Sequence, residues 1–510
     1  MNMLAALQPF GAPDCESDLE ILGESLYSKY YFGSVHFNRN PLDPFVYLIS
    51  GRRGSGKTAL AKFFSFQQSL QGAADIDVDE PAAFHEVISK IIEPSALNRD
   101  LQIPQLVKIW EYVIWSAIFY KLKDHDLRIQ ATCKFSEEGG LSSVIRSLLQ
   151  AVLNKYIDSN GCLYDELEGI LKSAAFEEAK KAVLEIAARN PLFISVDTLE
   201  KYSIHDEKLM MSVAALVEFG AIFCRQYASK GLYIKIFIMD EMFPYLMEEY
   251  ISNTLKYVKN EVYLHWKPKD LMKLICWRLF RYLRIKDITH SRTALINWKD
   301  HRDVKENVWK KYFGEFLEDV EDIHEKTFPF ILRHTHLRPR QLIVLCNAIA
   351  EQATMFGEFP KISSRSIIAG VEASGEILAQ EVFNAYSAVY PNAARIADAL
   401  SGISPIFTGK ELDKRAHRTA SQWSDEYSPY RFRQFVAELG IVGRVRQSDR
   451  NNTIVEADFE YFQTGRLVLG DEDLCAIHPM FYTKLNVQMK EKICVYPFPD
   501  HQEYRMGLSA

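Results

Sequence analysis

Short apolar runs alternate with long helical patterns in the first half of the chain. Four of these runs have the length and the residue types of buried strands: 45–50, 192–196, 234–239 and 261–266. Continuous apolar runs of this length are typical of strands buried on both faces of a parallel sheet. The pattern therefore predicts an α/β core at 45–265 that carries a helical insertion at about 84–189.

Beyond residue 266 the strand pattern stops and helical periodicity takes over. An amphipathic helix is predicted over 267–285, and a later helix opens at Pro339, a residue suited to the first helical turn. We therefore expect a helical lid at 266–385 and treat residues 1–44 as a lead-in to the first strand.

The last part of the chain has the pattern of a winged-helix domain at 390–485, followed by a tail at 486–510. Short helical segments precede a helix that Ser428 would cap. A hairpin predicted to turn at 448–452 follows this helix. Winged-helix domains contact either nucleic acid or protein, so this pattern alone does not select the partner.

Composition narrows the class of protein. The chain has 510 residues, of which 48% are hydrophobic, a content that supports packed cores. Its net charge is −7, which argues against a surface that binds nucleic acid nonspecifically. The eight cysteines include no C-x-x-C pair, which favours a reducing cytoplasm over a disulfide framework. The N-terminus lacks the pattern of a signal peptide, and no membrane-spanning segment is predicted.

The first predicted strand runs into GRRGSGKT, a complete Walker A motif of the form G-x-x-x-x-G-K-[ST]. Glycines let such a loop curl its backbone N–H groups around a polyphosphate. Lys57 is expected to reach the β and γ phosphates, and the Thr58 hydroxyl is expected to ligate Mg²⁺. The predicted nucleotide-binding residues are Gly51, Arg52, Arg53, Gly54, Ser55, Gly56, Lys57 and Thr58. The alternative is a glycine turn that binds nothing.

A Walker B acid is predicted at the end of a second strand. The run 192–196 ends in Asp197, and Glu200 follows three residues later. A carboxylate at the end of a strand beside the loop can hold Mg²⁺, and a second carboxylate can polarise the attacking water. We assign the first role to Asp197 and the second to Glu200.

A rival Walker B strand lies at 234–239 and ends in Asp240-Glu241. The order of elements favours the earlier strand, because it leaves this later one between the Walker A strand and the Walker B strand. On that reading Asp240 acts as a sensor near the γ-phosphate. The exchange of roles between Asp197 and Asp240 stays open.

Arginines supply further candidates. Arg338 and Arg340 flank Pro339 at the predicted helix start. A guanidinium held there could pair with a phosphate of the nucleotide. The alternative interpretation is that these arginines are solvated and bind no phosphate. Residues 405–450 hold nine Lys/Arg against six Asp/Glu. The arginines in that segment that could follow a phosphate backbone are Arg431, Arg433, Arg444, Arg446 and Arg450.

In its order of motifs the chain resembles the AAA+/STAND group of P-loop ATPases, including the origin-recognition ATPases. Several phrases are similar to a bacterial P-loop ATPase family often found in mobile and antiviral defence loci: YLISGRRGSGKTAL, FISVDTLEKY, IKIFIMDEMFPYL, LHWKPKDLMKLICWRLF, HLRPRQLIVLCNAIAEQA and AIHPMF. The resemblance spans about residues 25–485, and only its Walker A part is specific.

The resemblance implies an α/β P-loop NTPase core with a helical insertion, a helical lid and a C-terminal winged-helix domain. The roles it implies are phosphate binding by 51–58, Mg²⁺ coordination by Thr58 and Asp197, water activation by Glu200, sensing by Asp240, and an arginine sensor at Arg340 or Arg338. Two departures lower the expected hydrolysis rate. The acidic pair reads Asp197-Thr198-Leu199-Glu200 instead of D-G-x-D, and Met239 replaces an arginine often found at the end of the sensor strand.

The expected function is an ATP-binding, slowly hydrolysing switch that uses Mg²⁺ and controls an effector protein in bacterial antiviral defence. ATP is favoured over GTP because no N-K-x-D motif is visible. The expected partners are the effector and other copies of the chain, in the cytoplasm and away from membranes. Two alternatives stay open: a scaffold that binds ATP without turnover, and an ATP-dependent DNA-binding module that uses Arg431, Arg433, Arg444 and Arg446.

Overall fold

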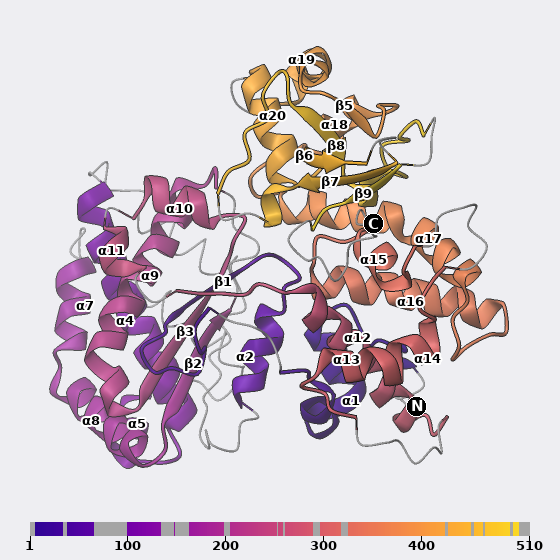
Figure 1. Cartoon of the computed structure of the whole chain (residues 1–510). Helices are drawn as coiled ribbons and strands as arrows, with labels where there is room; N and C mark the ends of the chain where they lie inside the picture. Colours follow the sequence, from indigo (N-terminus) through magenta and orange to yellow (C-terminus); the bar gives the residue numbers. More distant parts are fainter. Residues whose placement is uncertain are drawn as a thin grey trace. The chain divides into compact units, whose positions relative to one another are not determined.

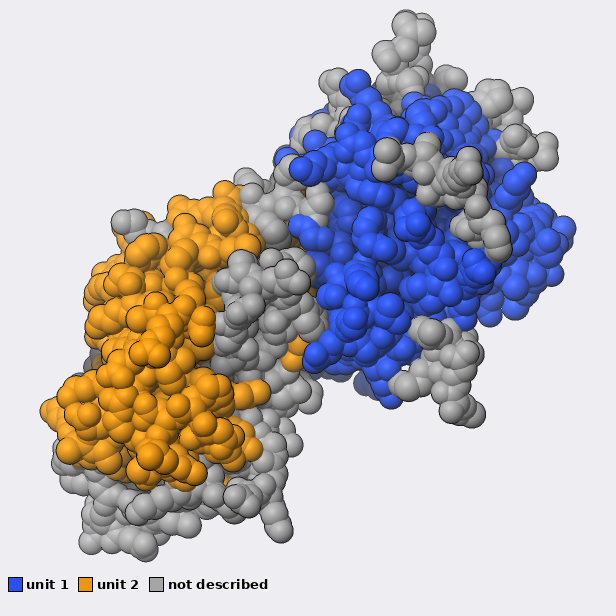
Figure 2. All heavy atoms as spheres, turned by 90° about the horizontal axis from the view of Figure 1, so that it is seen from below, with its two compact units in different colours: residues 1–36, 266–510 blue, residues 37–265 orange. Residues whose placement is uncertain are grey.

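The computed structural model divides the chain into two compact units. Unit 1 contains Met1–His36 and Trp266–Ala510, and unit 2 contains Phe37–His265 (Figure 2). The residues that the structure describes are 6–33, 38–65, 99–133, 147, 163–197, 204–251, 253–258, 261–288, 296–317, 325–423, 427–449, 453–462, 465–489 and 493–498.

Unit 2 is built on a four-stranded sheet in which every pair of neighbours is parallel. Its strands are β1 (Leu48–Gly51), β2 (Leu192–Asp197), β3 (Leu232–Met239) and β4 (Glu261–Tyr263). The order β2-β3-β1-β4 places β3 between β1 and β2, which confirms the order predicted from the sequence. The predicted α/β core with a parallel sheet is confirmed as well.

Helices cover both faces of this sheet. The helices of unit 2 are α2 (Lys57–Ser65), α4 (Arg99–Leu122), α5 (Leu127–Thr132), α7 (Leu163–Leu171), α8 (Ala174–Arg189), α9 (Glu207–Tyr227), α10 (Phe243–Glu249) and α11 (Thr254–Tyr257). Successive strand residues point to opposite faces, so Leu48 belongs to the core with α4 and α9, while Ile49 packs with Leu60 of α2. In Figure 1 α4 and α9 accordingly lie on one side of the strands and α2 on the other.

Aromatic side chains fill the larger of these two cores. Trp115 of α4 is fully buried, and its ring lies 5.7 Å from that of Phe223 and 5.2 Å from that of Tyr227, both on α9. The indole N–H of Trp110 donates to the carbonyl oxygen of Ser212 at 2.9 Å. The aromatic side chains of α4, Trp110 and Trp115 among them, therefore pack in the core.

The helical part of unit 1 begins with α1 (Cys15–Tyr30) and resumes at residue 268. Its further helices are α12 (Pro268–Ile285), α13 (His301–Val304), a π-helical turn at Lys305–Trp309, α14 (Lys310–Phe313), α15 (Thr327–Leu332), α16 (Pro339–Met355) and α17 (Ser364–Ala385). Pro339 occupies the first turn of α16, as predicted. Gly370 lets α17 approach α16 closely, because an added Cβ would lie 2.6 Å from the Cα of Ile349.

The C-terminal part of unit 1 combines short helices with a five-stranded sheet. These elements are α18 (Ala393–Ala397), β5 (Ile406–Thr408), α19 (Lys410–Ala416), α20 (Pro429–Glu438), β6 (Val442–Ser448), β7 (Ile454–Asp458), β8 (Leu474–Ile477) and β9 (Cys494–Tyr496). The strand order is β5-β8-β6-β7-β9, and all pairs are antiparallel except β7 with β9.

Two local predictions for this part are confirmed. The Ser428 side chain caps α20 by accepting the backbone N–H of Arg431. Strands β6 and β7 pair antiparallel, as a hairpin requires, while residues 450–452 of the predicted turn lie outside the described residues. Strand β9 lies in the stretch that the sequence assigned to a tail. Over the described ranges, no helix has both the length and the apolar character required to span a bilayer.

Candidate functional site

The glycine-rich loop, residues 51–58, connects the carboxyl end of β1 to the N-terminus of α2. Gly54 has φ +79° and Gly56 has φ +97°, values that side chains other than glycine rarely adopt. A Cβ on Gly51 would lie 2.6 Å from the Ser55 hydroxyl. The backbone N–H of Ser55 donates to the carbonyl oxygen of Arg52 at 3.0 Å, which tightens the turn. The predicted glycines therefore stand where the geometry requires them.

Lys57 is folded back onto this loop. Its ammonium group donates to the carbonyl oxygens of Gly51 at 2.9 Å and Arg52 at 3.2 Å, and the residue is only 4% exposed. Thr58 follows in the first turn of α2 and is half-buried. A buried cation and a helix N-terminus thus meet at one loop, and both favour a bound anion.

Asp240 lies directly against the loop. Its backbone N–H donates to the carbonyl oxygen of Gly51 at 3.1 Å, which continues the pairing of β3 with β1. Its carboxylate accepts the Tyr263 hydroxyl at 3.1 Å and lies 3.6 Å from the Arg52 guanidinium. Burial raises the pKa of Asp240, and the positive charge of Arg52 partly opposes that rise.

Glu241, the next residue, contacts the loop backbone. Both of its carboxylate oxygens accept the N–H of Arg53, at 3.1 and 3.2 Å, and the residue is 5% exposed. Glu241 was not among the predicted site residues, although the Asp240-Glu241 pair was visible at the end of its strand. Only the folded position of the loop reveals its contact.

Asp197 ends β2 at the same edge of the sheet. It pairs with Phe237, which in turn pairs with Ile49, so β3 separates Asp197 from the loop strand. Asp197 is half-buried. Its predicted companion Glu200 lies outside the described residues. The structure thus brings Lys57, Asp240 and the loop together and places Asp197 one strand further away.

The predicted arginine sensors belong to unit 1. Arg338 precedes α16 and is 2% exposed, while Arg340 donates from Nε to the carbonyl oxygen of Pro13 at 3.1 Å. Arg338 is thus buried within unit 1, and Arg340 binds a backbone carbonyl of the same unit. Their approach to a nucleotide stays a prediction.

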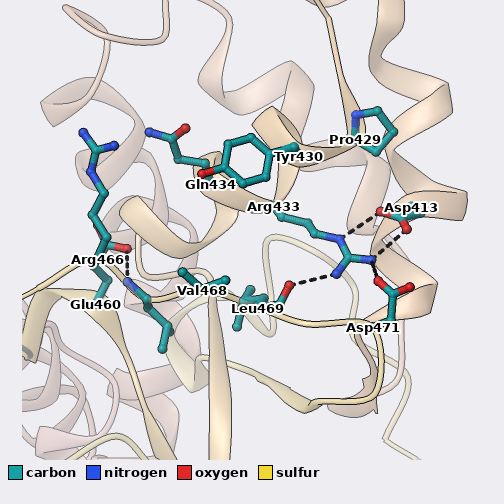
Figure 3. A pocket seen from close by; sticks show the side chains of 11 residues that line it. Asp413, Pro429, Tyr430, Arg433, Gln434, Glu460, Arg466, Val468, Leu469 and Asp471 are labelled. Atoms are coloured by element: carbon teal, nitrogen blue, oxygen red, sulfur yellow. Dashed lines mark hydrogen bonds and ion pairs between the residues drawn. The ribbon is translucent and has the colours of Figure 1, made fainter.

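The C-terminal arginines differ in their surroundings. Arg433 makes a two-point contact with Asp413, at 2.9 and 2.7 Å, and also binds Asp471 at 2.5 Å and the carbonyl oxygen of Leu469 at 2.8 Å (Figure 3). Its side chain is only 12% exposed. Arg433 therefore stabilises this domain and does not present its charge at the surface.

The remaining C-terminal arginines are placed differently. The Arg431 guanidinium lies 5.6 Å from the centre of the Trp423 ring, and Arg446 pairs with Asp458 at 3.2 Å. Arg444 is exposed on β6. Arg450 falls outside the described residues.

A pocket of about 300 Å³ opens beside Arg433 (Figure 3). It is lined by Asp413, Pro429, Tyr430, Arg433, Gln434, Glu460, Arg466, Leu467, Val468, Leu469 and Asp471. Two of these lining residues, Tyr430 and Val468, are 69% and 66% exposed. The positive charge of Arg433 in the pocket wall is balanced by the carboxylates of Asp413 and Asp471, which bind it.

Histidines do not form a metal site in the described part of the chain. Burial lowers the pKa of His334 to about 3, and its Nδ1 lies 2.8 Å from the carbonyl oxygen of Phe330. Within the described residues, no three or more His, Cys, Asp or Glu side chains are grouped to hold a metal ion.

One stretch of unit 1 is similar to a known protein family. Residues 283–377 match the family model of the FunZ-associated C-terminal helical domain. The match runs from the end of α12 into α17, so it covers the region where the sequence predicted a helical lid. No curated protein matches the chain.

Proposed function

We propose that the chain is a P-loop ATPase of the AAA+/STAND type, an ATP-binding and slowly hydrolysing switch that controls an effector protein. The observation that carries the proposal is the glycine-rich loop itself. It follows a parallel strand, has two glycines at positive φ, and delivers Lys57 and Thr58 to a helix N-terminus. Such a loop binds phosphate through backbone N–H groups and a lysine.

The residues around the loop suit a magnesium nucleotide. Lys57 has two weak neutral partners in the carbonyls of Gly51 and Arg52, and a phosphate is a stronger acceptor for its ammonium group. Thr58 would supply a hydroxyl to Mg²⁺, and Asp197 or Asp240 a carboxylate, which are the oxygen ligands this ion prefers. Bound Mg²⁺ would neutralise charge on the phosphates.

For hydrolysis we assign Asp197 to the metal, Glu200 to the attacking water and Asp240 to sensing. The strand order supports this assignment, since β3 lies between the loop strand and β2. Asp240→Asn is expected to uncouple lid movement from nucleotide, whereas Asp197→Asn is expected to abolish turnover while ATP still binds. The reverse pattern would exchange the two roles.

The setting that we propose is bacterial antiviral defence in the cytoplasm. It rests on the resemblance of the sequence and is supported by the match of residues 283–377 to a FunZ-associated domain. We further propose that the helical part of unit 1 is the lid and that its C-terminal part is a winged-helix domain. Helix α20 followed by the β6–β7 hairpin supports the second assignment.

Nucleotide binding tests the proposal. Titration calorimetry with Mg-ATP should give one site per chain, weaker binding of Mg-GTP, and loss of binding in Lys57→Ala. Lys181→Ala is the matched control, because that lysine is 62% exposed on α8 and pairs with Glu178 of the same helix. Absence of Mg-ATP binding by the folded wild type would refute the proposal.

A further inference from the structure

Glu241 is a buried acid that rests on the glycine-rich loop. Both carboxylate oxygens accept the Arg53 N–H, at 3.1 and 3.2 Å, in a residue only 5% exposed. The contact joins residues 188 positions apart, so it exists only in the folded unit. A carboxylate is an anion of the kind that concave arrangements of backbone N–H groups hold.

Several other charged or polar groups face this part of the loop. Lys57 contributes a cation from α2, and Arg52 contributes one from the loop. Asp240, the residue that follows β3, contributes a second carboxylate, and the Tyr263 hydroxyl reaches it from β4. Burial raises the pKa of the nearby Glu261 carboxyl, whose side chain accepts the Ser50 hydroxyl. The site therefore already contains acids of its own.

A polyphosphate that entered the loop would meet these acids. A backbone N–H serves one strong acceptor at a time, so phosphate and Glu241 would compete for the same donor. Two negative charges held close together in a buried site also repel each other by more than they would in water. Both effects oppose anion binding while Glu241 stays in place.

We infer that Glu241 is a resident anion of the glycine-rich loop, which a polyphosphate ligand must displace from the Arg53 N–H in order to bind. Glu241 thereby sets the affinity of the loop for phosphates. It is a positioning residue that acts through the loop backbone. That the displacing ligand is a nucleotide rests on the proposed function.

The experiment compares Glu241→Gln with the wild type, using inorganic tripolyphosphate and Mg-ATP as probes in titration calorimetry. Glutamine keeps an oxygen that can accept the Arg53 N–H but removes the charge. We expect both probes to bind about tenfold more tightly to Glu241→Gln. Glu249→Gln removes the same charge at an exposed position, the last residue of α10, and should bind both probes as the wild type does.

Hydrogen exchange provides a second measurement on the wild type alone. If tripolyphosphate displaces Glu241, amides of 239–243 should exchange faster when it is bound, while amides of 51–58 become protected. This measurement decides the matter even if Glu241→Gln does not fold.

The outcomes separate the two claims. Equal or weaker probe binding in folded Glu241→Gln, or unchanged exchange of 239–243 in the bound wild type, would overturn the role of Glu241. Mg-ATP binding that is lost in Lys57→Ala would still uphold the proposed function in that case. If neither wild type nor Glu241→Gln binds either probe, the proposed function and the role of Glu241 both fail.

Discussion

The ammonium group of Lys235 donates to the carbonyl oxygen of Val46 at 2.6 Å in the interior of unit 2. It also donates to the carbonyl oxygen of Asp43 at 2.7 Å, and the residue is fully buried. Lys235 thus fixes the segment that leads into β1 and the glycine-rich loop. Desolvation by burial lowers the pKa of Lys235 to about 7 from its ordinary 10.5.

This lowered pKa predicts a pH-dependent stability. Between about pH 7 and pH 10 the unfolded chain keeps the Lys235 proton while the folded chain loses it, so the free energy of unfolding should rise with pH across that window. Denaturant unfolding at several pH values should show this slope in the wild type. Lys235→Met should be less stable overall, because two carbonyls lose their donor, and it should lack that part of the slope. Equal slopes in both proteins would contradict the prediction.

A side chain at position 56 is expected to strain the backbone of the glycine-rich loop. Among the described residues, and apart from its two chain neighbours, no heavy atom lies within 4 Å of a Cβ added to Gly56, yet its φ is +97°. Gly56→Ala should therefore destabilise the protein by about 1–2 kcal/mol through strain and weaken Mg-ATP binding. Gly169→Ala in α7 is the matched control, since a Cβ added there also has no atom of the described residues within 4 Å beyond its own helix, and Gly169 has no left-handed φ. The control should stabilise by about 0.5–1 kcal/mol, and a similar loss in both variants would argue against strain at Gly56.

Arg433 predicts a loss of stability in the C-terminal domain. Arg433→Ala removes its contacts with two carboxylates and a carbonyl and leaves Asp413 and Asp471 without their shared cation. We expect a cost of about 2–3 kcal/mol in thermal or chemical unfolding. Arg444→Ala, on an exposed part of β6, should change stability by less than about 0.5 kcal/mol.

The same arginines test the DNA-binding alternative. Salt-sensitive DNA binding that falls in Arg444→Ala, with stability unchanged, would support that alternative. Absence of DNA binding by the wild type would remove it. Loss of DNA binding in Arg433→Ala alone would not count, since that variant is expected to be destabilised.

The hydroxyl of Tyr496, in β9, is expected to contribute to the free energy of unfolding. Its hydroxyl donates to Glu325 at 2.6 Å, and Glu325 also pairs with Arg333 at 3.1 Å. Tyr496→Phe should lower the free energy of unfolding by about 1.5–3 kcal/mol, because a buried carboxylate loses a hydrogen-bond donor. Tyr430→Phe is the control at a residue 69% exposed, and it should change little. Equal stability of wild type and Tyr496→Phe would show that this bond does not hold β9.

The sequence predicted the parts of the fold that local pattern determines. The apolar runs that end in Asp197 and Asp240 are long enough to identify β2 and β3, and Ser428 with Pro429 marks the start of α20. Strands β5 and β9 were not predicted, because each has three residues and is defined by its pairing partner.

The candidate site shows the same division. The glycine-rich loop is predicted from one contiguous motif, and its glycines adopt the expected conformations. The contact of Glu241 with Arg53 spans 188 positions, and the ion pairs of Arg433 with Asp413 and Asp471 span 20 and 38. Charge pattern alone makes such arginines look available for phosphate, since it contains no information on which distant acid will neutralise them.

Joint measurement of ATP turnover and assembly state tests whether the chain is a hydrolysing switch. Wild type, Lys57→Ala and Glu200→Gln would be compared at saturating Mg-ATP, with phosphate release and light scattering recorded on each. We expect slow turnover in the wild type, none in either variant, and one nucleotide-bound assembly that persists in Glu200→Gln. Wild-type protein that binds Mg-ATP tightly but releases no phosphate would contradict the claim of a hydrolysing switch and indicate an ATP-bound scaffold.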